Sequence, residues 1–139
     1  MAEDDGLARF QKRLQAIPAD VRAAVKPALV AAAEDMARTM RALVPEDTGA
    51  LKASITVTGP GQATPAYSQP GGAVLVGETQ AAVTAGNTDV RYAHLVEYGT
   101  RHAAAQPFFW PAERLHRKKA TAKIRRAIGK AVRGRKGAP

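Results

Sequence analysis

The sequence predicts an α+β fold, in which a small antiparallel sheet of three to four strands is packed by a long N-terminal helix and a basic C-terminal helix. Apolar residues recur at three- and four-residue steps through residues 20–43, and again among many basic residues after residue 112. Between these segments, short runs rich in Val, Ile and Thr are separated by Gly and Pro, as expected of strands and turns. At 139 residues, the chain is expected to form a single domain, 1–139, with a core of its own.

The N-terminal part of the chain is expected to be helical. Residues 1–17 contain a short helix from about residue 5 to residue 16. Its apolar stripe comprises Leu7, Phe10 and Leu14. Pro18 ends that helix and suits the first turn of the next one, which runs to Leu43. The apolar face of this long helix comprises Val21, Val25, Leu29, Ala32, Met36, Met40 and Leu43. Pro27 is expected to kink or split it, because a proline lacks an N–H donor and clashes with the preceding turn.

The middle of the chain is expected to contain the sheet. Pro45 stops the long helix, and Asp47 or Thr48 can cap a short turn that begins near Gly49. The three strand candidates are residues 55–58, 73–77 and 81–86. Between the first two, residues 59–72 are rich in Gly, Pro, Gln, Ser and Thr, and we expect them to form a long flexible loop.

Residues 92–112 contain most of the aromatic side chains, namely two of the three tyrosines, two of the three phenylalanines and the only tryptophan. This concentration indicates a core nucleus, a contact surface for a partner, or both. A helix is expected to end at Gly99, and Pro111 and Glu113 suit the first turn of the terminal helix. The apolar stripe of the terminal helix comprises Leu115, Ile124, Ile128 and Val132. Residues 134–139 are expected to be a frayed tail.

The net charge of +9 is unevenly distributed along the chain. Glu113 is the only acidic residue after Tyr98, whereas about half of all Lys and Arg lie between residues 114 and 136. Such a segment attracts polyanions and acidic surfaces through a salt-dependent term that does not depend on sequence. The residues predicted to contact a polyanion or a partner are Arg117, Lys118, Lys119, Lys123, Arg125, Arg126 and Lys130. The alternative is an ordinary solvated helix face.

Composition and motifs argue against catalysis, metal binding and a membrane location. There is no cysteine, and no apolar run is long enough to cross a bilayer. His94 and Glu97 have helical i,i+3 spacing, but no third ligand has a spacing that completes a metal site. No serine lies in a Gly-x-Ser-x-Gly turn, and no phosphate-binding glycine loop is present. We therefore expect no enzyme activity, no cofactor and no small-molecule substrate.

The order of three motifs resembles a known protein family. The motifs are Pro45-x-Asp-Thr-Gly-x-Leu-x-x-Ser-Ile55, Tyr92-Ala-x-x-Val-Glu-Tyr-Gly-Thr100 and Gln106-Pro-Phe-x-x-Pro-Ala112. Together with the strand region and the basic terminal helix, they resemble the neck or tail-completion proteins of HK97-type tailed phages, which also occur in prophages and gene-transfer particles. The resemblance covers residues from about 20 to 132.

The resemblance implies a structural virion protein at the head–tail junction or tail top of a long-tailed phage, assembled in the cytoplasm of the bacterial host. Proteins of this kind form rings around the DNA channel, so the implied partners are further copies in a homo-hexamer or larger ring, neighbouring neck, connector or tail-tube proteins, and DNA in the lumen. Whether the subunit is a stopper, a tail terminator or a joining protein stays open. The alternative functions are a basic DNA-binding accessory protein and a small regulatory or toxin-like factor, each encoded by a mobile element. The motif residues implied to be structural are Asp47, Thr48, Gly49, Tyr92, Glu97, Gly99, Thr100, Pro107 and Phe108.

Overall fold

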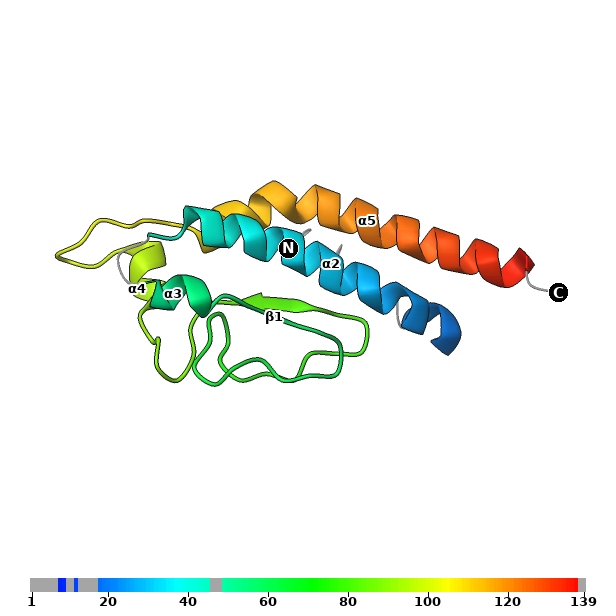
Figure 1. Ribbon diagram of the computed structural model, residues 1–139, viewed down its shortest axis with the longest axis horizontal. Helices are drawn as coiled ribbons and strands as arrows, with labels where there is room; N and C mark the ends of the chain where they lie inside the picture. Colours follow the sequence, from blue (N-terminus) through cyan, green and yellow to red (C-terminus); the bar gives the residue numbers. More distant parts are fainter. Residues whose placement is uncertain (1–7, 10–11, 13–17, 46–48, 138–139) are drawn as a thin grey trace.

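The computed structural model describes residues 8–9, 12, 18–45 and 49–137, and it shows an α+β architecture with two long helices (Figure 1). The predicted helix at residues 5–16, and the positions Asp47 and Thr48, therefore lie wholly or mostly outside the described residues. The elements with residue bounds are α2 (Ala19–Leu43), α3 (Ala50–Ala53), β1 (Thr56–Thr58), β2 (Ala82–Thr84), α4 (Ala93–Tyr98) and α5 (Phe109–Gly137).

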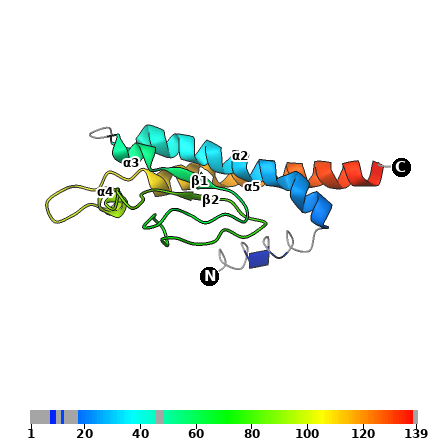
Figure 2. The same ribbon diagram turned by 60° about the horizontal axis from the view of Figure 1, so that its bottom comes forward.

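The long helices α2 and α5 lie side by side and run in opposite directions (Figures 1 and 2). Pro27 lies inside α2 without dividing it, so α2 is one helix of 25 residues. Half of the helix pair is held by a small cluster built from buried Val21, Val25 and Leu29 of α2. The residues of α5 that pack against this cluster are Ile124, Ile128, Ala131 and Val132.

A larger core lies at the other end of the helix pair, where α2 ends and α5 begins. It joins both long helices to α3, to α4 and to the sheet. Its buried members are Ala37, Met40, Val44, Leu51, Ile55, Ala85, Val90, Ala93, Phe108, Phe109 and Ala112. Two of the predicted aromatic residues, Phe108 and Phe109, are thus at the centre of the fold, and Phe108 is only 1% exposed.

Two residues predicted to be on apolar helix faces are exposed instead. Leu43 is 47% exposed, because the chain leaves α2 at Val44 in an extended conformation and Val44 is buried in its place. Leu115 is 66% exposed, because α5 turns Ala112 and His116 toward α2 and the core, and Leu115 points away from them. The predictions for these two leucines were wrong, whereas those for Ile124, Ile128 and Val132 are confirmed.

The described sheet has two antiparallel strands, in place of the three to four that the sequence predicted. Strands β1 and β2 pair with Thr56 opposite Thr84, Val57 opposite Val83 and Thr58 opposite Ala82. The predicted strand at residues 73–77 forms only an isolated bridge, between Leu75 and Ala63. Its neighbours exchange backbone hydrogen bonds with the 61–64 segment, and glycines on both sides keep the pairing short.

The segment between the strands, residues 59–81, lies on the far side of the sheet from α2 in both views (Figures 1 and 2). It is tied to the sheet by two hydrogen bonds between the backbones of Gln69 and Ala85, at 2.8 and 3.0 Å. Within it, the buried Thr64 hydroxyl donates to the carbonyl of Gly72 at 2.7 Å. The chain therefore folds back on itself here through hydrogen bonds, with hardly any regular strand.

Candidate functional site

The carboxylate of Glu97 caps the N-terminus of α5. Its Oε1 atom accepts hydrogen bonds from the backbone N–H groups of Phe108, at 2.9 Å, and Phe109, at 2.8 Å, and its Oε2 atom accepts one from Trp110 at 3.2 Å. The first N–H groups of a helix have no partner within the helix, and the helix dipole favours a negative charge there. Glu97, a residue of α4, thus acts as the N-terminal cap of α5, and it is only 7% exposed.

The segment between the two helices brings these residues together. Gly99 has a φ of +79°, and a Cβ at this position would meet the backbone nitrogen of Ala105 at 2.7 Å. The hydroxyl of Thr100 accepts from the N–H groups of the next turn, and the Gln106 N–H donates to the carbonyl of Val96 at 2.8 Å. The chain therefore leaves α4, turns and comes back to it, so that Phe108 arrives beside Glu97.

Residues 100–107 form a projection from this end of the molecule. All eight residues are exposed, and the projection extends past both long helices (Figure 1). Pro107 is the last exposed residue before the chain enters the core at Phe108. The motif positions Gly99 and Thr100 shape the base of the projection, and Pro107 and Phe108 lead the chain into α5.

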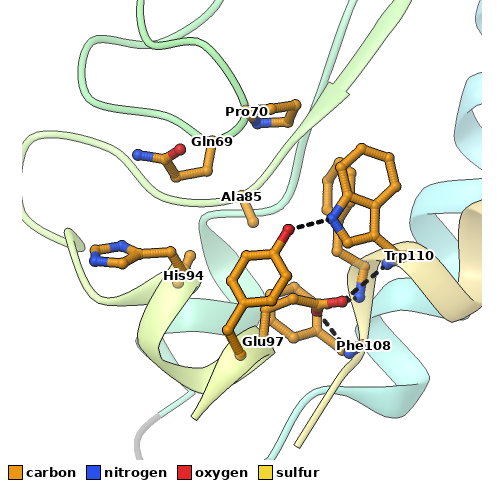
Figure 3. Close-up of a pocket in the computed structure, with 10 residues that line it drawn as sticks. Gln69, Pro70, Ala85, His94, Glu97, Phe108 and Trp110 are labelled. Atoms are coloured by element: carbon orange, nitrogen blue, oxygen red, sulfur yellow. Dashed lines mark hydrogen bonds between the residues drawn. The ribbon is translucent and has the colours of Figure 1, made fainter. Parts of the chain in front are cut away.

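Beside the projection lies an open pocket of ≈ 340 Å³, including solvent at its mouth. Its rim is formed by the 68% exposed Tyr98, whose phenol oxygen accepts a hydrogen bond of 2.7 Å from the indole Nε1 of Trp110. Gln69 and Pro70 face these aromatic rings from the 59–81 segment (Figure 3). The pocket is therefore built from the aromatic stretch, for which a core or a partner contact was predicted, and from the segment predicted to be a long loop.

The other motif residues have backbone roles. Gly49 adopts the left-handed conformation, with φ of +72°, at the start of the short helix α3. Tyr92 precedes α4 as its N-cap residue and packs, partly buried, against the larger core. Buried Ser54 links the first motif to the second strand, because its hydroxyl accepts from the Gly86 N–H at 2.9 Å and donates to the Leu51 carbonyl at 2.6 Å.

Two of the predicted polyanion contacts are engaged within the protein. Arg117 forms two hydrogen bonds with Glu113 on the same helix, at 2.9 and 2.8 Å. Lys123 points toward α2, where its Nζ atom lies 2.6 Å from Oδ2 of Asp35. This hydrogen bond lowers the pKa of Asp35 below its ordinary value, against a smaller opposing effect of burial. Lys123 therefore joins the two long helices.

The histidines are separated in the structure. The Nε2 atom of His116 shares a 2.6 Å hydrogen bond with the hydroxyl of Thr39, which links α5 to α2. His94 lines the pocket, and His102 lies in the projection. Among the residues that the structure describes, no group of three or more His, Asp or Glu side chains is placed to hold a metal ion. None of the described helices is long and apolar enough to span a membrane.

The sequence pattern indicated the aromatic motif but did not reveal the role of Glu97. It placed Glu97 at a helix end, and the helix whose start it closes is 11 residues further on. A conceivable signal is a glutamate that directly precedes a glycine-containing turn and a Pro-Phe entry to a helix. It also left Arg114 and Arg133 out of the basic set, although both are exposed on α5.

The motif residues that the structure describes hold helix ends and turns in place. The family model described as "Bacteriophage HK97-gp10, putative tail-component" matches residues 8–99, about two thirds of the chain. The chain belongs to this family of phage tail components and is a structural protein of a virion. The matched part includes Glu97, and α5, whose start Glu97 closes, lies beyond it. Comparison with curated proteins gave no match, and neither did comparison with solved structures.

Proposed function

We propose that the protein is a ring-forming subunit at the head–tail junction or tail top of a long-tailed phage, without catalytic activity. The proposal extends the family assignment, which identifies a tail component, to a specific place and assembly. A closed ring of identical subunits requires two different surfaces on each subunit that fit one another. The observation that carries the proposal is the presence of exposed large apolar side chains on two parts of this chain, near α4 and on the 59–81 segment.

The first set of exposed apolar residues, which we call the α4 surface, comprises Leu43 at the end of α2 and Leu95 and Tyr98 of α4. These residues are 47%, 44% and 68% exposed. Interfaces are enriched in aromatic residues relative to the rest of a protein surface. The projection adds eight exposed residues beside this surface. The α4 surface thus offers both an apolar patch and a protruding element to a neighbour.

The second surface, which we call the loop surface, lies on the 59–81 segment and comprises Tyr67, Val74 and Leu75. They are 54%, 49% and 73% exposed. Tyr67 is held in a left-handed conformation, with φ of 63°, and the guanidinium of Arg91 lies 3.7 Å from the centre of its ring. A residue other than glycine rarely adopts this conformation, so its retention in an exposed position favours a role in contact.

Particle assembly tests the proposal. In a phage that carries this gene, the double variants Val74→Ser/Leu75→Ser and Leu95→Ser/Tyr98→Ser are expected to give DNA-filled heads and free tails that fail to join. Negative-stain electron microscopy would count joined particles. The matched control is Leu115→Ser, because Leu115 is 66% exposed but lies outside both surfaces. Normal numbers of joined particles from both double variants would refute the ring contact.

A basic DNA-binding accessory protein is the second candidate function, favoured by the exposed cations of α5. The same assay separates the two functions. An accessory protein has no need of the α4 and loop surfaces, so particles would join normally in both double variants. DNA binding by the isolated chain is compatible with either function and does not discriminate between them.

A further inference from the structure

The outward side of α5 carries a long row of cations. Residues 114–133 span about 28 Å at 1.5 Å per residue. The exposed cations of this segment, excluding the paired Arg117, are Arg114, Lys118, Lys119, Arg125, Arg126, Lys130 and Arg133. None of these seven side chains forms an ion pair with a residue that the structure describes. We call this set the cationic face.

The cationic face is continuous and accessible. At 100° per residue, its members cover an arc of roughly 160° from Arg114 to Lys130. Ala122 and Gly129 lie along the middle of this arc, so cations stand on both sides of a line of small residues. In Figure 1, α5 forms one edge of the molecule, with α2 between it and the sheet. A large ligand can therefore approach the helix along its whole length.

A second copy of the chain is a poor partner for this face. Each copy carries a net charge of +9, so adding copies to a ring increases the positive charge. The described residues hold seven carboxylates. Glu34, Asp35, Glu78 and Glu113 are in ion pairs, Glu97 is bound to the start of α5, and Asp20 also has an interaction partner, which leaves Asp89. A polyanion therefore complements the cationic face better than a second copy of the chain does.

The side chains on the face indicate which kind of polyanion it fits. Leu115 is its only large apolar residue, whereas the centres of protein interfaces are rich in aromatic residues and poor in Lys. It has no aromatic ring on which unpaired bases could stack, as single-strand binding proteins do. It also has no Asn or Gln of the kind that pairs with adenine edges. A duplex recognised through its phosphates matches all three observations.

We propose that the cationic face of α5 binds the phosphate backbone of double-stranded DNA without reading its sequence. Within the ring of the proposed function, which this inference deepens and on which its place in the particle rests, the face would contact the DNA that passes through the lumen. The binding itself belongs to the single chain. It can therefore be measured without ring assembly.

The test is a titration of the full chain against fluorescent DNA duplexes of about 20 base pairs and unrelated sequences, followed by anisotropy over a range of salt concentrations. The logarithm of the binding constant falls by about 0.9 per phosphate contact for each tenfold rise in salt concentration. If all seven cations contact phosphates, the slope of log K against log[salt] is therefore about −6. The variant Lys118→Gln/Arg125→Gln/Arg126→Gln is expected to reduce the magnitude of this slope by about 2.7. Glutamine is a good helix former, and the replaced side chains are exposed, so circular dichroism should be unchanged.

The matched control removes three cations elsewhere, in the variant Lys52→Gln/Arg91→Gln/Arg101→Gln. It has the same net charge as the α5 variant, and its salt slope is expected to stay near that of the wild type. The proposal would be overturned by equal losses in the two variants, by absence of DNA binding at about 50 mM salt, or by a strong preference for one duplex sequence. Binding to polyglutamate as tight as to DNA would overturn it in favour of an acidic protein surface.

The two proposals fail in different experiments. Particles that join normally in the α4 and loop surface variants would refute the ring contact and leave DNA binding by α5 standing. Joined particles that depend on those surfaces, together with a chain that does not bind duplex DNA, would refute only the inference about α5.

Discussion

Removal of the Glu97 carboxylate is expected to loosen the start of α5 and to destabilise the whole fold. In Glu97→Ala, three backbone N–H groups lose their acceptor, at heavy-atom distances of 2.9, 2.8 and 3.2 Å. Those of Phe108 and Phe109 belong to buried residues, which are 1% and 8% exposed. A buried donor without a partner costs about 1–3 kcal/mol, so we expect a loss of about 2–5 kcal/mol in the free energy of unfolding.

Glu97→Gln separates the hydrogen bonds from the charge. A glutamine retains one carbonyl oxygen, which can replace the Oε1 atom that accepts from Phe108 and Phe109. Its NH₂ group cannot accept from Trp110, and the favourable interaction of a negative charge with the helix dipole is lost. The expected loss is about 1–2 kcal/mol, smaller than that of Glu97→Ala.

The assay is urea denaturation followed by far-UV circular dichroism at neutral pH. Glu113→Gln is the matched control, because Glu113 also lies near the start of α5, but the partner of its carboxylate among the described residues is the exposed side chain of Arg117. Such a pair is worth about 0.3–0.5 kcal/mol. If Glu97→Ala remained within that small range of the wild type, the role of Glu97 as the cap of α5 would be refuted.

Three further predictions concern the helix pair, the projection and the core. Asp35→Asn should lower the free energy of unfolding by about 0.2–1 kcal/mol at neutral pH. The hydrogen bond and ion pair with Lys123 lower the pKa of Asp35 in the folded state, so this contribution is present above the pKa of the unfolded state and disappears as the pH falls through the pKa of the folded state. The urea denaturation curves of variant and wild type should therefore converge in acid. Gly99→Ala should displace the projection, because the new Cβ would meet the Ala105 nitrogen at 2.7 Å; faster proteolysis of residues 100–107 than in the wild type would show it, and an unchanged rate would contradict it. Phe108→Ala should lower the free energy of unfolding by about 3–5 kcal/mol in urea titrations, since Phe108 is 1% exposed, and a loss below about 1 kcal/mol would show that the core closes over the gap.

The helices were predictable from the sequence because their signal is periodic and local. The apolar residues of α2 recur over seven positions, and all but Met36 and Leu43 are buried. The error at Leu43 came from the helix end, where one extended residue, Val44, turns into the core and displaces its neighbour from it. Periodicity describes a continuing helix and gives no information about the turn that follows it.

The sheet was less predictable because its pairing depends on contacts between distant residues. Residues 73–77 have a composition suited to a strand, and they pair only with the short segment 61–64, which lies between Pro60 and Pro65. A single bridge results. The predicted flexibility of residues 59–72 stays a prediction, as does the fraying of residues 134–139.

The residues of the candidate site were predicted from the sequence, but the hydrogen bonds that join them were not. Glu97, Gly99, Pro107 and Phe108 were all identified from the motifs, yet the bond from Glu97 to the start of α5 spans 11 residues and depends on how the projection folds back. Likewise, the pairing of Lys123 with Asp35 spans 88 residues. The set of contact cations predicted from the sequence therefore included Arg117 and Lys123, which are paired within the protein, and omitted the exposed Arg114 and Arg133.

Trp110, which is hydrogen-bonded to Tyr98, gives the protein an intrinsic fluorescence signal. Trp110 is the only tryptophan of the chain, and it lies at the pocket beside the α4 surface. Its emission spectrum therefore comes from a single known environment, at the end of the molecule where the proposed neighbour would bind. Burial of that end in a ring would shift the emission to shorter wavelength, so assembly could be followed in unlabelled protein in real time.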